Sequence, residues 1–218
     1  MCRGSYGREK TISLASLSGS SDVESLSDIG LFTQAGYLTI KAVEYGNTVF
    51  LDYPNLEVKR AMAQLYTELL LKGKVAGQVG AGDIVRVLNN DDPEEVFHIL
   101  NRLFAAIDYQ SYPVTDEASV RAFIQVYLAG AGLDPKVECH NAHGRSDLEV
   151  NVGARLWVFE LKTAHEGKSA DAALQEAINQ LTSRRYEEQD AVGKLERVAL
   201  VFSLRERRFV RWAAVPET

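Results

Sequence analysis

The 218-residue chain has few cysteines and no long apolar run. Cys2 and Cys139 are its two thiols, which excludes a disulfide framework and a four-cysteine zinc site and makes the reducing cytosol the expected compartment. No stretch approaches the roughly 18–20 apolar residues that span a bilayer. The first residues also lack the apolar segment of a signal peptide, so we expect a cytoplasmic protein without a membrane partner.

An excess of positive charge is also missing. Lysine and arginine total 24 against 30 aspartates and glutamates, which gives a formal net charge of −6. A protein that coats DNA by charge alone should be basic, so a contact with nucleic acid must depend on a local patch or on metal ions. The hydrophobic content of 46 % and the charged content of 25 % are typical of a globular protein.

The first half of the chain contains two regions that differ in composition and in hydrophobic pattern. Residues 1–30 hold seven serines between Ser13 and Ser27 and show little periodic hydrophobicity, which predicts a disordered tail. Residues 31–113 predict a small α+β accessory unit that begins with a hairpin of two β-rich runs, 37–43 and 48–53. Further along, Asp92, Pro93 and Glu95 have the pattern of a helix start with a capping box.

Residues 114–218 predict an α/β domain with a mixed sheet. A helix capped by Thr115 comes first, three short strands follow it, and a second helix and another strand complete the order α-β-β-β-α-β. The expected segments are a helix over 115–128, strands over 136–140, 146–152 and 156–162, a helix over 171–184 and a strand over 197–204.

The second and third of these strands carry the residues with the clearest chemistry. Side chains alternate along a strand, so Glu160 and Lys162 share one face. If Gly153 and Ala154 form a two-residue hairpin turn, Asp147 lies opposite Glu160 with the Cβ atoms roughly 4.5–5.5 Å apart. Two like charges placed there destabilise the sheet. A hard divalent cation such as Mg²⁺ would remove the conflict, and Lys162 would face a substrate bound at that ion.

A third carboxylate belongs to the helix that precedes the strands. Glu117 lies three positions before Val120 and seven before Ile124, on the helix face that packs against the sheet. From the start of the helix it can reach inward to the same site.

These residues resemble the signature of the PD-(D/E)XK nuclease superfamily. The resemblance covers about residues 115–215 and rests on Glu117, Asp147 and Glu160-Leu161-Lys162 in the order α-β-β-β-α-β. More narrowly, the chain looks like the nuclease-like domain that is often found C-terminal to an AAA-ATPase-like domain. This likeness rests on Gly144-Arg145-Ser146-Asp147-Leu148, Phe159-Glu160-Leu161-Lys162 and Gln180 with Tyr186. Residues 32–69 resemble the region that joins those two domains. The implied fold is a restriction-endonuclease-like αβββαβ core preceded by a small α+β unit.

The resemblance also implies an activity. It implies a nuclease that uses Mg²⁺ to hydrolyse phosphodiester bonds of DNA, and Mn²⁺ can substitute for Mg²⁺. Asp147, Glu160, the Leu161 carbonyl and Glu117 would hold the metal, and Lys162 would position the metal-activated water and stabilise the developing negative charge. Gln180 would support the site. The implied substrate-binding residues are Tyr186, Arg184, Arg185 and Arg145.

The sequence departs from these relatives in two places. It contains no Gly-x-x-x-x-Gly-Lys-Ser/Thr motif, so we expect either a truncated gene product or a protein that uses the ATPase motor of an AAA-type partner in trans. Arg121 stands where the matching helix of relatives leads us to expect a histidine.

Several alternatives stay open. A fold can persist after its chemistry is lost, so the chain can also be a catalytically inactive interaction module that partners an AAA-type ATPase. Exposed strands at the sheet edge make a homodimer an option.

His140 and His143 fit solvated loop residues better than a metal pair. Arg205, Arg207, Arg208 and Arg211 are candidates for phosphate contacts or simply for a solvated face.

Overall fold

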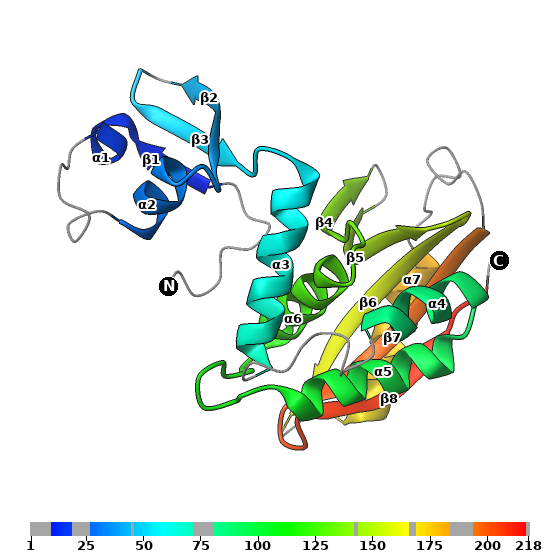
Figure 1. Ribbon diagram of the computed structural model, residues 1–218. Helices are drawn as coiled ribbons and strands as arrows, with labels where there is room; N and C mark the ends of the chain where they lie inside the picture. Colours follow the sequence, from blue (N-terminus) through cyan, green and yellow to red (C-terminus); the bar gives the residue numbers. More distant parts are fainter. Residues whose placement is uncertain are drawn as a thin grey trace. The chain divides into compact units, whose positions relative to one another are not determined.

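The computed structural model describes residues 10–18, 27–44, 46–71, 81–141, 144–165, 169–183 and 194–216, with the backbone alone at 10, 18, 81, 138–141 and 144–146. The chain forms two compact units, one up to Met62 and one from Ala63 onward (Figure 1). Within the described residues, none of the helices has the length and apolar character that crossing a bilayer requires.

The first unit is built on a three-stranded antiparallel sheet. Strand β3 (Thr48–Asp52) lies in the centre and pairs with β1 (Lys10–Ser13) on one side and with β2 (Thr39–Glu44) on the other. Two short helices, α1 (Leu14–Ser18) and α2 (Asp28–Gln34), connect β1 to β2 along the chain. The β2–β3 hairpin is the one that the two β-rich runs predict.

The second unit holds the remaining helices and a five-stranded sheet. Helix α3 (Leu56–Leu70) contains the boundary between the units. It is followed by α4 (Ala81–Asn90), α5 (Pro93–Ala106), α6 (Glu117–Gly130), β4 (Lys136–Asn141), β5 (Gly144–Val152), β6 (Arg155–Ala164), α7 (Ala170–Ser183), β7 (Lys194–Ser203) and β8 (Arg208–Ala214). From α6 to β7 this is the expected α-β-β-β-α-β order.

The helix starts follow from local hydrogen bonding. Asp92 caps α5 as predicted: its side chain accepts from the Glu95 N–H at 3.0 Å, and Pro93 occupies the first helical position. The sequence predicts Thr115 as the cap of helix α6, but the residue that caps this helix is Asp116. The Asp116 side chain accepts from the Ser119 N–H at 2.8 Å, because Ser119 three positions on completes a reciprocal cap.

The sheet has the strand order β4-β5-β6-β7-β8. Strands β6 and β7 run parallel and are connected by α7, whereas the other neighbours are antiparallel. A parallel pair needs a crossover connection, and α7 supplies it. The result is the mixed α/β architecture that the sequence predicts.

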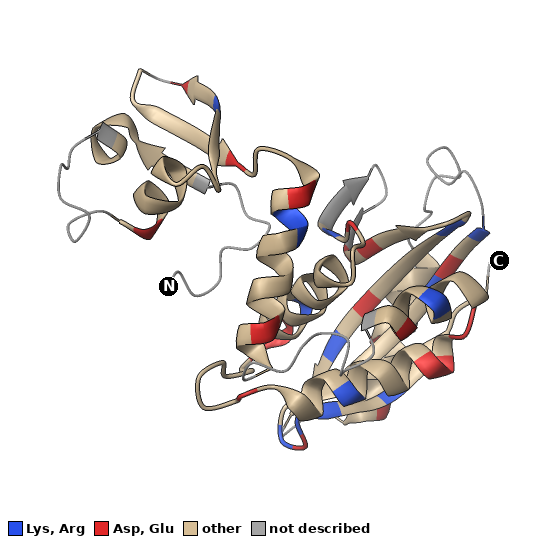
Figure 2. Cartoon of the chain, in the orientation of Figure 1, with Lys and Arg blue, Asp and Glu red and all other residues tan. Residues whose placement is uncertain are grey.

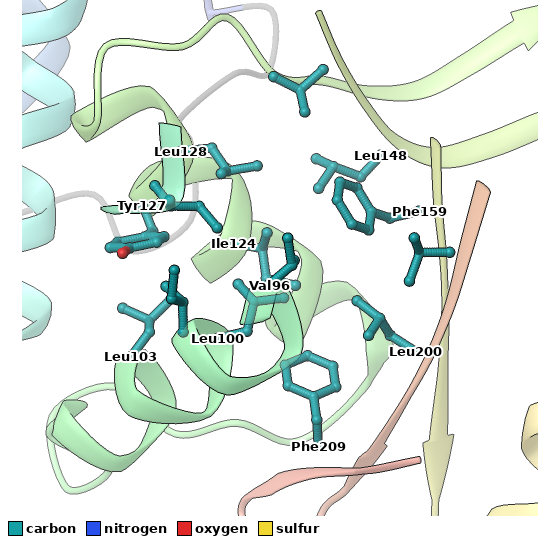
Figure 3. Close-up of a cluster of buried hydrophobic side chains, with 14 of the residues drawn as sticks. Val96, Leu100, Leu103, Ile124, Tyr127, Leu128, Leu148, Phe159, Leu200 and Phe209 are labelled. Carbon is teal, nitrogen blue, oxygen red and sulfur yellow. The ribbon is translucent and has the colours of Figure 1, made fainter. Parts of the chain in front are cut away.

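Helices cover both faces of this sheet. Figure 3 shows one core, in which Val96, Leu100 and Leu103 of α5 and Ile124, Tyr127 and Leu128 of α6 meet Leu148, Phe159, Leu200 and Phe209 of the strands. On the opposite face, Val158 and Ala199 pack against Ala177 and Leu181 of α7. Burial of these apolar side chains on both faces fixes the sheet between α4–α6 and α7.

The units are divided differently from the sequence-based expectation. A boundary was expected after Pro113, but α4 and α5 share the core of the five-stranded sheet and belong to the second unit. The apolar stripe of α5 shows that the helix has a buried face and does not show what covers that face. Part of the expected tail over residues 1–30 also forms regular structure, namely β1, α1 and the start of α2.

The position of α6 depends on a close approach to α3. The buried hydroxyl of Thr67 lies 2.8 Å from the Ala63 carbonyl in its own helix and 3.3 Å from the Val126 carbonyl of α6. A Cβ atom at Gly130 would lie 2.6 Å from Thr67 Oγ1, closer than real Cβ contacts. The glycine therefore allows the two helices to approach, and this approach places the helix that carries Glu117.

Gly130→Ala tests this approach. Alanine is the better helix former, but we expect a loss of about 1–3 kcal/mol in unfolding free energy because Thr67 must move. Gly82 in α4 is the control, since nothing lies within 4 Å of a Cβ added there and Gly82→Ala should stabilise by up to about 1 kcal/mol. Urea unfolding measures both. A stabilising Gly130→Ala would contradict the close packing of α3 and α6.

Candidate active site

The candidate site lies where strands β5 and β6 stop pairing. Their hairpin turns at Gly153 and Ala154, and the pairs run from Val152–Arg155 to Leu148–Phe159, which is the predicted register. Gly153 has φ +58°, a conformation that glycine adopts without strain. The next pair in this register, Asp147 with Glu160, does not join the ladder.

Asp147, Glu160 and Lys162 belong to the same face of the sheet. Leu148, Phe159 and Leu161 point into the core under α4–α6. Because side chains alternate along a strand, their neighbours Asp147, Glu160 and Lys162 belong to the opposite face, together with Val158. All three polar side chains are buried, and Glu160 is only 1 % exposed.

Both oxygens of the Asp147 carboxylate are engaged. Oδ2 accepts a hydrogen bond from the backbone N–H of Leu161 at 2.9 Å, and Oδ1 lies 3.4 Å from Nη1 of Arg121 in α6. The side chain of Asp147 thus takes the place of a backbone acceptor for β6, just beyond the last pair of the ladder. Buried backbone N–H groups need such a partner, and this bond fixes the position of the carboxylate.

Lys162 joins the two other carboxylates. Its Nζ lies 3.2 Å from Glu160 Oε1, two residues earlier on the same strand, and 3.5 Å from Glu117 Oε1 in the first turn of α6. Because the β5–β6 ladder has already ended, the side chains of α6 reach this point from the other layer. The structure therefore brings Glu117, Asp147, Glu160 and Lys162 together, as the sequence predicts.

The charges around Lys162 keep it protonated. Burial lowers the pKa of its ammonium group, but the negative charges of Glu117, Glu160 and Asp147 act in the opposite direction and prevail, so that the pKa is raised. Lys162 is therefore a cation over the whole neutral range. It can donate hydrogen bonds and stabilise negative charge, but it cannot accept a proton as a general base.

The donor set suits a hard divalent cation. Carboxylate oxygens of Asp147, Glu160 and Glu117 and the Leu161 carbonyl are ligands of the kind that Mg²⁺ prefers. In the part of the chain that the structure describes, however, no group of three or more His, Cys, Asp or Glu side chains has the geometry of a metal site. Asp147 and Glu160 are held instead by Arg121 and Lys162, and these pairs would have to rearrange around an ion.

Gln180 lies on the helix that covers this face of the sheet. Helix α7 packs through Ala177 and Leu181 against Val158, a neighbour of Glu160 on β6. The Oε1 atom of Gln180 is buried and has no hydrogen-bond partner in the described structure. A buried amide oxygen without a partner costs free energy.

Several expected residues fall outside the described structure. Tyr186, Arg184 and Arg185 lie between α7 and β7, in 184–193, and His143 lies in 142–143. Arg145 and His140 belong to strands β5 and β4 by their backbone, with side chains that are not described.

The basic cluster near the C-terminus is engaged within the protein. Arg208 pairs with Glu206 at 2.6 Å, and Arg211 pairs with Asp171 at 2.8 Å. Arg207 lies over the ring of Tyr109 at 4.8 Å. Figure 2 likewise shows acidic and basic positions interspersed on the helices and strands of the second unit. Arg207, Arg208 and Arg211 thus each have a partner within the protein.

Arg121 is the site residue to which the sequence reasoning gave no role. It follows Glu117 by four positions, so both side chains lie on one side of α6. That spacing, together with an arginine next to the apolar residues of the helix, was the signal that could have placed it in the site.

Comparison with known proteins supports this interpretation of the geometry. Residues 115–212 match a family model described as the PD-(D/E)XK nuclease superfamily. The matched segment runs from the residue before the cap of α6 into β8 and contains all the site residues above.

A longer likeness is to an "Uncharacterized protein in vnfD 5'region" of Azotobacter chroococcum mcd 1. It is 28 % identical over 175 residues, which are 77 % of this chain and 34 % of that protein. The chain thus spans about a third of the length of this relative. No solved structure matches the chain.

Replacing Lys162 tests the charge balance. Lys162→Met removes a cation from the almost fully buried Glu160, so we expect unfolding free energy to fall by about 3 kcal/mol. A raised pKa means that the ammonium stabilises the fold below its ordinary pKa of 10.5 and loses this effect only above it. The loss should therefore be present at pH 7 and at pH 9.

The control for Lys162→Met is Lys194→Met. Lys194 also pairs with carboxylates, Glu196 and Asp91, but is exposed, so that its replacement should change urea unfolding little. If Lys162→Met changed the free energy of unfolding as little as Lys194→Met, the ion pairs at the site would not be stabilising the buried Glu160.

Proposed function

We propose that the chain is a metal-dependent nuclease that hydrolyses phosphodiester bonds of DNA, with Mg²⁺ as the ion and Mn²⁺ as a substitute. The observation that carries the proposal is the meeting of Asp147, Glu160 and Lys162 on one buried face, at the point where β5 leaves β6. Carboxylates can hold the ion of metal-assisted phosphoryl chemistry, and an adjacent ammonium group can stabilise the negative charge that develops.

Each residue of the site has a distinct task in this proposal. Asp147 and Glu160 hold the ion, with the Leu161 carbonyl and Glu117 as further oxygen ligands, and the Leu161 N–H keeps the Asp147 carboxylate in place. A divalent cation bound there lowers the pKa of a water molecule and polarises a phosphate oxygen. Lys162 would orient the attacking water through its hydrogen bonds and stabilise the negative charge that develops on the phosphate.

Residues around the site would bind the nucleic acid. The buried and unpartnered Oε1 of Gln180 can accept a hydrogen bond from a water or from substrate, and Tyr186, Arg184, Arg185 and Arg145 are the proposed contacts to the DNA backbone. With a net charge of −6, the protein must rely on such local contacts and on the ion.

A second candidate function is an interaction module without catalysis. It is favoured by one observation: in the described residues no group of three ligands has the geometry of a metal site, and Asp147 and Glu160 are paired with Arg121 and Lys162. The AAA-type ATPase in trans would then be the partner. For that partner or for a homodimer, the sheet ends at β4 and β8, where another strand could pair.

Cleavage assays separate the two functions. Plasmid and linear DNA should be cut in the presence of Mg²⁺ or Mn²⁺, and Asp147→Asn and Lys162→Ala should each lower the rate by at least about a hundredfold. The control is Glu196→Gln, because Glu196 is a half-buried carboxylate that pairs with Arg155 at 3.4 Å away from the site. No cleavage with either metal, or cleavage that the site variants leave unchanged, would favour the inactive module.

Metal binding has its own readout in the absence of DNA. An ion that binds only the folded protein raises the melting temperature, so Mn²⁺ should stabilise the wild type and Glu196→Gln. Asp147→Ala should show a much smaller shift in thermal unfolding. Equal shifts in wild type and Asp147→Ala would place the ion elsewhere on the protein.

A further inference from the structure

Arg121 occupies a place that the proposed chemistry assigns to a metal ion. Its guanidinium lies 3.4 Å from Asp147 Oδ1, while the other oxygen of Asp147 is taken by the Leu161 N–H. The side chain is 13 % exposed, so it is largely enclosed and yet has access to solvent. In this state Arg121 neutralises the carboxylate that a metal would need.

An ion at Asp147 and a guanidinium beside Asp147 repel one another. The site contains the three carboxylates of Glu117, Asp147 and Glu160 and the two cations of Arg121 and Lys162. Adding a divalent cation changes this group from a net negative to a net positive charge. Screening by salt is weak at such a buried place, so Arg121 must move away from the ion or toward an incoming anion.

We propose that Arg121 competes with the metal for Asp147 and, once displaced, contacts the phosphate of the bound substrate. This inference rests on the proposed function. A guanidinium has a planar fork of donors that matches two phosphate oxygens, and a phosphodiester at the ion supplies the negative charge that Arg121 has lost. Arg121 thus lowers metal affinity in the free protein and favours metal binding together with substrate.

The first measurement is metal affinity without DNA. Titration calorimetry with Mn²⁺ compares the wild type with Arg121→Gln and Arg121→Lys. Arg121→Gln should bind Mn²⁺ at least about tenfold more tightly, because a competing charge is gone, whereas Arg121→Lys should bind as the wild type does. Arg155→Gln is the control, since Arg155 pairs with Glu196 at the same 3.4 Å and is also half-buried; its Mn²⁺ affinity should not change.

The second measurement is DNA cleavage at saturating Mn²⁺. Arg121→Gln should cleave at least about tenfold more slowly despite its tighter metal binding, with a raised KM for DNA. Arg121→Lys should lie between the two. A purely structural role of Arg121 predicts the opposite sign for the metal, because a disordered Asp147 binds an ion less well.

The outcomes are distinct. Tighter metal binding together with slower cleavage supports the proposal. Unchanged or weaker metal binding by Arg121→Gln overturns it, and undiminished cleavage by that variant overturns the phosphate contact. A wild type that binds no Mn²⁺ overturns the proposed function and this inference together. If Arg121→Gln does not fold, Arg121→Lys decides, and an unaltered KM for DNA in that variant overturns the proposal.

Discussion

The hydrogen bond from the Leu161 N–H to Asp147 Oδ2, at 2.9 Å, is the contact on which the site depends. A strand in the middle of a sheet must find an acceptor for each N–H, and here a carboxylate replaces the departing backbone of β5. Strand β5 can therefore leave β6 without an unpaired donor. The same bond fixes the Asp147 carboxylate beside Glu160 and Lys162, at a point that the side chains of α6 can reach.

The charges of the site then follow from burial. A carboxylate as enclosed as Glu160, 1 % exposed, is tolerated only with a cation or strong donors beside it. Lys162 meets this need from the same strand, and Arg121 meets it for Asp147 from α6. Each of these two buried carboxylates thus has a cation beside it. The net charge of the chain says nothing about this local balance.

Much of this arrangement was predictable from local rules, and some of it was not. The β5–β6 register follows from a two-residue turn at Gly153, and the shared face of Glu160 and Lys162 follows from strand alternation. The end of the ladder before Asp147 did not follow, because it depends on a side chain replacing a backbone acceptor. The boundary expected after Pro113 differs from the structure for a similar reason: periodicity predicted the buried face of α5 but not what covers it. Asn101 of α5 is hydrogen-bonded to Phe209 of β8, 108 positions later in the chain.

That long-range packing also decides which part of the chain supports the candidate site. The residues that match the nuclease superfamily, 115–212, form one half of a core whose other half comes from α4 and α5. Leu88 at the end of α4 accepts the indole N–H of the buried Trp157 at 2.8 Å, and Thr67 of α3 sets the approach of α6. Without α3–α5, the apolar face with Leu148 and Phe159 would be exposed to water, and the helix that presents Glu117 and Arg121 would lose its support. The candidate site therefore depends on the whole second unit, since the scaffold outside the matched segment holds the charged side chains in place.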